Sequence, residues 1–192
     1  MTRIAIFASG SGTNAENIIN YFKENKKIEV GCIISNKKDA FVLERAKNLN
    51  IPSAFFSKEE FNSTSKVIEY LIQSKINFIV LAGFLLKVPQ NLLNLFPQNI
   101  INIHPALLPK FGGKGMYGDN VHKAVVEANE TESGITIHYV NENYDEGAII
   151  FQAKCKVEQN DTYDMVAQKV HKLEYEYFPQ IIEDLLQKKC FY

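Results

Sequence analysis

Two polar residues, Asn102 and His104, stand at the end of an apolar run with one residue between them. Alternate side chains of an extended strand point to the same side, so both should share one face. An asparagine amide can donate a hydrogen bond to an oxyanion, and a histidine can accept or release a proton. The alternative is a histidine satisfied inside the core, but the irregular segment that follows, residues 104–118, favours a functional role.

A third candidate group, the carboxylate of Asp145, lies in the polar segment of residues 141–147. Polar residues are common in hairpin turns, so this aspartate needs no function to explain it. His138, on the stretch before this segment, is equally ambiguous, because its side chain could face a ligand or solvent. Spacing alone therefore leaves the roles of Asp145 and His138 open.

The first predicted strand ends in a glycine-rich segment, residues 9–15, which includes Gly12, Thr13 and Asn14. Glycines permit a tight turn, and the helix that follows would present free N–H groups to an anion. Three interpretations are open: a site for a single phosphate, a dinucleotide site, and a turn with only a structural role. A dinucleotide site needs an acidic residue about 20 positions further on. Ser35-Asn36 stand there instead, which favours the single phosphate.

Strand and helix patterns alternate along the first half of the chain, which predicts an α/β fold with a parallel sheet. Apolar runs predict strands at residues 3–8, 28–34, 53–55, 78–81 and 100–103. Helical spacing predicts helices at residues 13–23, 39–48 (capped by Asp39), 58–74, 120–129 and 162–188. Two further strands, residues 134–140 and 148–157, are joined by a polar turn. We therefore expect a Rossmann-like, doubly wound, mostly parallel sheet closed by a C-terminal antiparallel hairpin, with ligands at the carboxyl ends of its strands.

The composition excludes several classes of protein. The chain has 192 residues, 46% of them hydrophobic, and a formal net charge of -1, which predicts one ordered domain over residues 1–192 without a general attraction to nucleic acid. No apolar run approaches the roughly 18 residues of a membrane span. Cys32, Cys155 and Cys190 are too far apart for a zinc site or a disulfide framework. We expect a cytoplasmic protein without a metal, a nucleic-acid partner or a membrane anchor.

Five short motifs follow one another over almost the whole chain. They are Ser9-Gly10-Ser11-Gly12-Thr13-Asn14, Leu81-Ala82-Gly83-Phe84, Asn102-Ile103-His104-Pro105-Ala106-Leu107-Leu108-Pro109, Gly134-Ile135-Thr136-Ile137-His138 and Asp145-Glu146-Gly147. In this order they resemble the phosphoribosylglycinamide formyltransferases, a family of folate-dependent formyltransferases. The resemblance implies the formyltransferase fold and the transfer of a formyl group from 10-formyltetrahydrofolate to the amine of glycinamide ribonucleotide, in purine biosynthesis.

The resemblance also implies roles for individual residues. Asn102, His104 and Asp145 correspond to a catalytic trio that stabilises an oxyanion and transfers the amine proton without a metal. Because a carboxylate raises the pKa of a neighbouring histidine, we expect Asp145 to favour the protonated form of His104. The substrate-binding positions are Gly12, Thr13 and Asn14 for the phosphate, Glu174 for the ribose, and Leu85, Leu86, Lys87, Val88, Asn102, Asn141, Asp145 and Lys58 for the folate.

The sequence differs from the family at two places. A familiar member has an arginine at the position of Leu86, and the segment of residues 110–118 is longer here than in some relatives. This segment contains several glycines together with Lys110 and Lys114, and we expect it to fold over the ribonucleotide; a plain surface loop is the alternative.

Two other interpretations of the activity stay open. One is a formyltransferase that acts on another amine, such as an amino-sugar nucleotide or methionyl-tRNA. The tRNA enzyme needs a further C-terminal domain, for which the last residues leave no room. The other is a nucleotide-binding module without catalysis, which would explain the glycine-rich segment but not the pair Asn102 and His104. We expect a monomer or a homodimer.

Overall fold

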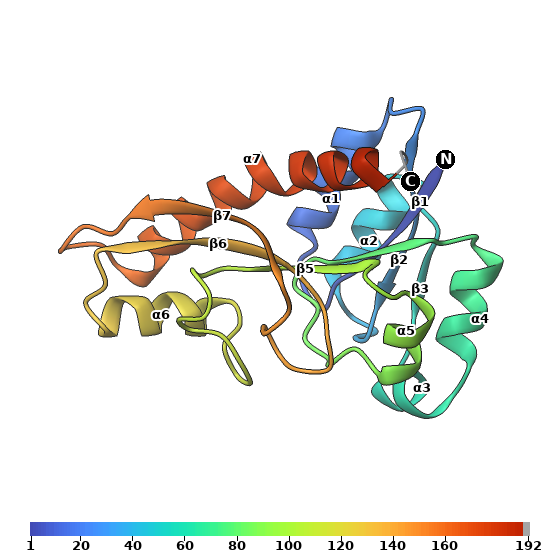
Figure 1. The fold of residues 1–192 in the computed structure, drawn as a ribbon, viewed down its shortest axis with the longest axis horizontal. Helices are drawn as coiled ribbons and strands as arrows, with labels where there is room; N and C mark the ends of the chain where they lie inside the picture. The colour runs from blue at the N-terminus through green and yellow to red at the C-terminus, as the bar shows by residue number, and fades with distance from the viewer. Residues whose placement is uncertain (190–192) are drawn as a thin grey trace.

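The computed structural model describes residues 1–189, and a seven-stranded sheet runs through it in the order β3-β2-β1-β4-β5-β6-β7. Figure 1 shows this sheet with helices packed around it. The strands are β1 (Thr2–Phe7), β2 (Ile28–Ser35), β3 (Ser53–Phe55), β4 (Phe78–Leu81), β5 (Ile100–His104), β6 (Glu132–Tyr139) and β7 (Ile149–Lys156). The helices are α1 (Thr13–Phe22), α2 (Phe41–Asn48), α3 (Lys58–Ser63), α4 (Lys66–Gln73), α5 (Gln90–Leu95), α6 (Asp119–Glu127) and α7 (Tyr163–Lys189).

The first five strands run parallel to one another, β6 runs in the opposite direction, and β7 follows the direction of the first five again. β1 pairs with both β2 and β4, β3 pairs with β2, and β5 pairs with β4, all in parallel. β6 is antiparallel to β5 and to β7. The predicted doubly wound sheet with a C-terminal antiparallel hairpin is therefore confirmed. The strand order changes direction between β1 and β4, and ligands of such sheets bind at the carboxyl ends of the strands at this point.

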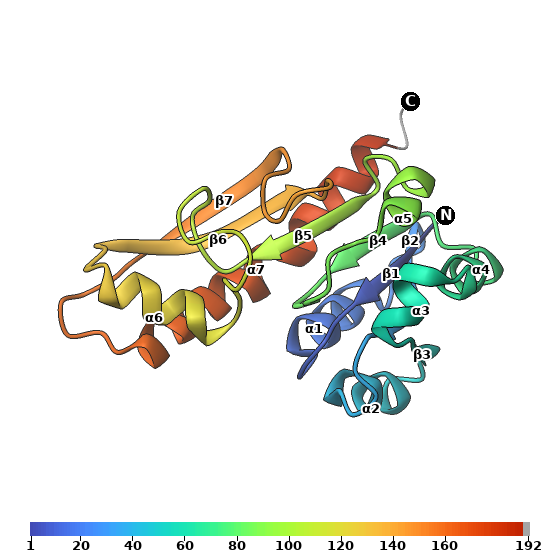
Figure 2. The ribbon, with the colours of Figure 1, turned by 90° about the horizontal axis from the view of Figure 1, so that it is seen from below.

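Apolar side chains fill both faces of the sheet, because alternate residues of a strand point to opposite sides. On β1, Ile4 and Ile6 belong to the core cluster that contains residues of α1, α2 and α7. Ala5 and Phe7 belong to the cluster that contains residues of α3, α4 and α5. Figure 2 shows the long α7 running beside β6 and β7. Burial on both sides explains why the parallel strands read as continuous apolar runs.

Three local expectations differ from the structure. The single helix expected over residues 58–74 is two helices, because Thr64 is extended and its hydroxyl donates to the carbonyl of Glu60 and accepts from the N–H of Lys66. Such side-chain bonds compete with the helical ladder. Asp39 does not cap α2, which begins after Ala40 without a side-chain cap. The short helix α5 was not expected at all.

No helix within residues 1–189 combines the length and apolar character needed to cross a lipid bilayer. Cys32 and Cys155 are free thiols, while Cys190 lies outside the described residues.

Candidate active site

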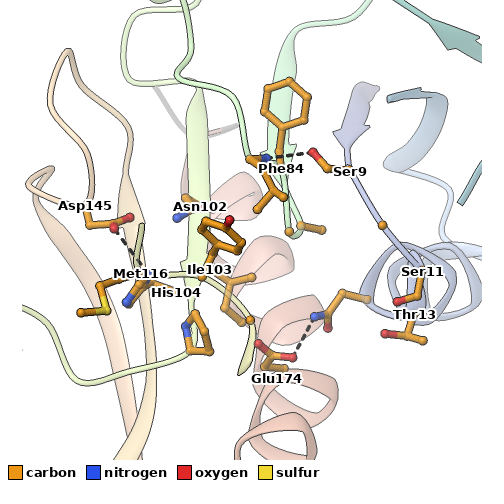
Figure 3. A pocket seen from close by; sticks show the side chains of 18 of the residues that line it. Ser9, Ser11, Thr13, Phe84, Asn102, Ile103, His104, Met116, Asp145 and Glu174 are labelled. Atoms are coloured by element: carbon orange, nitrogen blue, oxygen red, sulfur yellow. Dashed lines mark hydrogen bonds and ion pairs between the residues drawn. The ribbon is translucent and has the colours of Figure 1, made fainter. Parts of the chain in front are cut away.

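A cavity of about 670 Å³ opens where the parallel strands end. Its walls come from the segments after β1, β4 and β5, from the segment before β7, and from α7. Figure 3 shows Asn102, His104 and Asp145 on one side of this cavity, with Thr13 and Glu174 on the other. Residues that are far apart in the sequence therefore face one space at the place where the sheet topology predicts a ligand.

The three predicted catalytic side chains meet at the end of β5. His104 is the last residue of the strand and is 3% exposed. Its Nε2 donates to the carbonyl of Phe111 at 2.8 Å, and its Nδ1 is 3.6 Å from Oδ2 of Asp145. The same carboxylate oxygen accepts the backbone N–H of Gly113 at 2.9 Å. The loop after β5 therefore holds the side chains of His104 and Asp145 in position through its backbone.

Burial and charge act in opposite directions on His104. Desolvation lowers its pKa and outweighs the Asp145 carboxylate and the Phe111 carbonyl, which raise it; the net pKa lies below the ordinary value of 6.5. Our expectation of a protonated His104 was therefore wrong, because it considered the Asp145 carboxylate but not the burial of the imidazole at the end of β5. Burial alone would raise the pKa of Asp145, but His138, His104 and the Gly113 N–H lower it below the ordinary value. Near neutral pH the pair consists of a neutral imidazole and a carboxylate.

The glycine-rich loop after β1 is pressed against α2. Gly12 has a φ of 76°, and a Cβ atom there would lie 2.3 Å from Cγ2 of Val42. The Nε of Arg45 donates to the carbonyl of Ser11 at 2.8 Å, which adds a second tie to α2. On the other side, the Ser9 hydroxyl accepts the N–H of Leu85 at 2.8 Å and links the loop to the segment after β4. The loop is thus fixed by contacts with α2 on one side and with the segment after β4 on the other.

Helix α7 supplies a buried carboxylate to the same end of the cavity. Oε2 of Glu174, a residue that is 5% exposed, accepts from Nδ2 of Asn14 and lies 2.9 Å from both that atom and Nδ1 of His171. The bond to Glu174 raises the pKa of His171. His122 on α6 also lines the cavity, with its ring 6.1 Å from that of His171. Neither histidine was singled out from the sequence, although the i, i+3 spacing of His171 and Glu174 on one helix was a usable signal.

The two lysines of the glycine-rich segment after β5 have different surroundings. Lys114 lines the cavity together with its neighbours Gly113, Gly115 and Tyr117. Lys110 instead forms an ion pair with Glu130, at 2.8 Å, and lines a separate cavity. Only the second half of the segment is therefore in position to contact a ligand that occupies the main cavity.

A model of the formyl transferase family matches residues 2–182 of this chain. The chain belongs to this family. The phosphoribosylglycinamide formyltransferase of Bacillus subtilis is 36% identical over 191 residues, which cover 97% of this chain and 95% of that protein. The chloroplastic phosphoribosylglycinamide formyltransferase of Arabidopsis thaliana is 37% identical over 193 residues, but the alignment covers only 66% of its length. The chain therefore spans about two thirds of that plant relative.

Solved structures agree with the family assignment. The crystal structure of the phosphoribosylglycinamide formyltransferase from Bacillus halodurans has a TM-score of 0.87 and 36% sequence identity to this chain. The match covers 98% of this chain and 97% of that one. The resemblance to the phosphoribosylglycinamide formyltransferases, stated from five motifs, is thereby confirmed.

In this member of the formyl transferase family, the predicted folate residues fall into two groups. Leu85, Asn102 and Asp145 line the cavity. The other predicted residues do not line the cavity. Val88 belongs to the core cluster that contains residues of α3, α4 and α5, and Leu86 packs against it. Lys87 and Lys58 are exposed, and the side chain of Asn141 accepts the N–H of Asn143. Val88 as a whole is only 4% exposed.

Proposed function

We propose that this chain transfers the formyl group of 10-formyltetrahydrofolate to the amine of glycinamide ribonucleotide, a step in purine biosynthesis. The observation that carries the proposal is one cavity with two kinds of wall. Asn102, His104 and Asp145 supply groups suited to acyl transfer, and the start of α1, which includes Asn14, supplies N–H groups suited to an anion near the Glu174 carboxylate. The family membership narrows the chemistry to formyl transfer.

The ribonucleotide fits the end of the cavity formed by α1 and α7. The free N–H groups at the start of α1, from Thr13 and Asn14, suit the phosphate, because a helix N-terminus attracts anions. The Glu174 carboxylate suits the ribose hydroxyls as an acceptor. Oδ1 of Asn14 is buried and has no hydrogen-bond partner within residues 1–189, so a hydroxyl of the substrate would satisfy it. His171, with its raised pKa, and Lys114 add positive charge at the cavity wall.

The folate fits the other end of the cavity. Ala82, Phe84 and Leu85 line it after β4, and Ile103 lines it from β5. These apolar groups suit the face of a heterocycle, while the Asn102 amide beside them suits its formyl oxygen. In this arrangement the formyl carbon lies between the Asn102 amide and the amine of the ribonucleotide.

The chemistry follows from the charges that attack creates. The amine adds to the formyl carbon, so negative charge develops on the formyl oxygen, where Asn102 donates a hydrogen bond. The amine nitrogen must lose one proton and the departing folate nitrogen must gain one. Nδ1 of the neutral His104 and Oδ2 of Asp145 are 3.6 Å apart and can hold this proton between the two events. The reaction is then balanced without a covalent bond to the protein.

A direct assay of formyl transfer tests the proposal, with purified wild type and the variants His104→Ala and Asp145→Asn. Loss of an acid–base group typically lowers the rate by about 10² to 10⁴-fold, so both variants should be at least that slow. Lys110→Ala is the matched control, because its ammonium pairs with Glu130 outside the cavity. The proposal is wrong if folded wild type has no activity, or if both active-site variants keep full activity. Binding of NAD in place of both substrates, measured by calorimetry, would favour the nucleotide-binding module.

The cytoplasmic location, the single domain over residues 1–192 and the assembly as a monomer or homodimer stay predictions.

A further inference from the structure

His138 lies on β6 opposite Asn102 on β5, where the two residues are register partners. Its Nε2 is 3.1 Å from Nδ2 of Asn102, and its Nδ1 is 2.8 Å from the carbonyl oxygen of Tyr139. The side chain is 2% exposed, and it is not among the residues of the described chain that line the main cavity. Asn102 does line it. His138 can therefore influence a bound substrate only through its neighbours.

The two partners of His138 define where its proton lies. A carbonyl oxygen only accepts hydrogen bonds, so Nδ1 must carry a hydrogen to bond to Tyr139. A neutral imidazole has one N–H, which leaves Nε2 as an acceptor. The group that faces it must then be a donor, which is the amide nitrogen of Asn102. The opposite orientation of the amide, with its oxygen towards His138, would require a second proton on the imidazole.

The amide has two N–H groups, and His138 uses one of them. The second stays available to the cavity that Asn102 lines, where it can donate to a developing oxyanion. If the amide turned over, its oxygen would stand beside His138, and the nitrogen would take the place that the oxygen now holds. The position of one proton on His138 therefore decides which end of Asn102 bonds to the imidazole and which end is free.

The titratable groups that face His138 are Asp145, on the segment after β6, and His104, on β5. Oδ1 of Asp145 is 3.6 Å from Nε2 of His138, outside hydrogen-bond distance. A proton added to Nε2 would point towards this carboxylate and displace the N–H of Asn102, because two donors cannot share one contact. The neutral form of His138 is therefore the form that keeps Asn102 as a donor.

Gly147 makes the bond between His138 and Tyr139 possible. A Cβ atom at this glycine would lie 1.7 Å from the Tyr139 carbonyl oxygen and 3.5 Å from Nδ1 of His138. Only a residue without a side chain allows the chain to pass so close to that carbonyl. The glycine thus preserves the acceptor that holds the proton on Nδ1.

We propose that His138 is a positioning residue that orients the Asn102 amide for oxyanion stabilisation, acting as the neutral Nδ1–H tautomer. This role rests on the proposed formyl transfer, in which the oxyanion arises from the formyl group. The tautomer itself is a property of the protein without substrate, so it can be tested separately from the activity.

Long-range ¹H–¹⁵N correlation spectra of protein labelled at histidine distinguish the two neutral tautomers and the cation. The chain has only four histidines, which makes assignment tractable. We expect the signals of His138 to show the Nδ1–H tautomer, and those of His104, whose Nε2 donates to Phe111, to show the opposite one. An Nε2–H tautomer or an imidazolium at His138 would overturn the proposal, whatever the activity of the protein.

Kinetics of two variants then test the positioning role. His138→Leu removes the acceptor for Asn102, and we expect kcat to fall by at least about tenfold, short of the roughly 10² to 10³-fold loss typical of deleting an oxyanion donor. KM for both substrates should change by less than about threefold, because His138 touches neither. His138→Gln keeps an acceptor oxygen and should recover part of kcat.

A control separates positioning from general damage to β6. Ile137→Val loosens the same strand from the core without touching Asn102, and its kcat should equal that of the wild type. A folded His138→Leu variant with wild-type kcat would refute the positioning role, as would equal losses in the Leu and Gln variants. Absence of formyl transfer in the wild type would refute the proposed function instead, and the tautomer spectra would still decide the orientation of Asn102.

Discussion

Replacing Gly12 by alanine should both destabilise the protein and weaken ribonucleotide binding. The φ of 76° is a left-handed conformation, which costs an L-residue about 1–2 kcal/mol. The added Cβ would lie 2.3 Å from Cγ2 and 2.9 Å from Cα of Val42, and overpacking of this kind costs about 1–3 kcal/mol. The free energy of unfolding should therefore fall by about 2–5 kcal/mol. A domain with roughly 5–15 kcal/mol of stability would still fold.

Gly10→Ala is the matched control, since a Cβ at Gly10 would meet nothing within 4 Å and its φ is not positive. Urea unfolding of both variants, compared at equal m, gives the two changes in free energy. We expect the Gly10 variant to stay within about 0.5 kcal/mol of wild type. To relieve the contact with Val42 the loop must move, so KM for the ribonucleotide should rise in the Gly12 variant. Equal stabilities of the two variants, or an unchanged KM with a lowered stability, would refute the reasoning.

Three further predictions concern charge in the cavity. Because burial lowers the pKa of His104, kcat/KM should stay constant at neutral pH and fall only as the pH drops through this lowered pKa. The neutral imidazole also stabilises the fold above the ordinary pKa of 6.5, and this contribution is lost as the pH falls. The free energy of unfolding, measured with urea from about pH 8 to about pH 5, should therefore depend less on pH in His104→Asn than in the wild type. Glu174→Gln weakens two charge-assisted bonds, one from Asn14, and should raise KM for the ribonucleotide about tenfold with little change in kcat; steady-state kinetics with an unchanged KM would contradict the ribose assignment. Lys114→Ala should raise the same KM by about 2–5-fold, and Lys110→Ala should leave it unchanged; equal effects would place the anion contact elsewhere.

The sheet could be predicted from the sequence because its strands are short apolar runs with glycine or polar residues at their ends. The period of apolar residues reports which faces are buried, and burial on both faces identifies parallel strands. The prediction of one continuous helix over residues 58–74 was wrong because the helical spacing of apolar residues continues across Thr64. The hydroxyl of that residue interrupts the helix through two local bonds, to Glu60 and Lys66, that leave no trace in the period.

The sequence motifs predicted which residues form the candidate site. They did not predict properties that depend on opposing effects in the folded protein, such as burial against a neighbouring charge. Asn102, His104 and Asp145 come together as expected, although the latter two are 41 positions apart in sequence. The protonation state of His104 was not predictable, because it depends on how much burial outweighs a carboxylate 3.6 Å away. The bond between Asn14 and Glu174 joins residues 160 positions apart, and only the folded chain reveals it. His171 was missed although its i, i+3 spacing from Glu174 on one helix was a usable signal.

The most direct test of the central claim follows the formyl carbon itself. The protein is mixed with 10-formyltetrahydrofolate labelled with ¹³C in the formyl group and with equal amounts of glycinamide ribonucleotide and an amino-sugar nucleotide, and the products are read by ¹³C NMR. We predict that the label appears in formylglycinamide ribonucleotide alone, and that Asp145→Asn slows its appearance. Label in the sugar nucleotide, or release of labelled formate without transfer, would contradict the account.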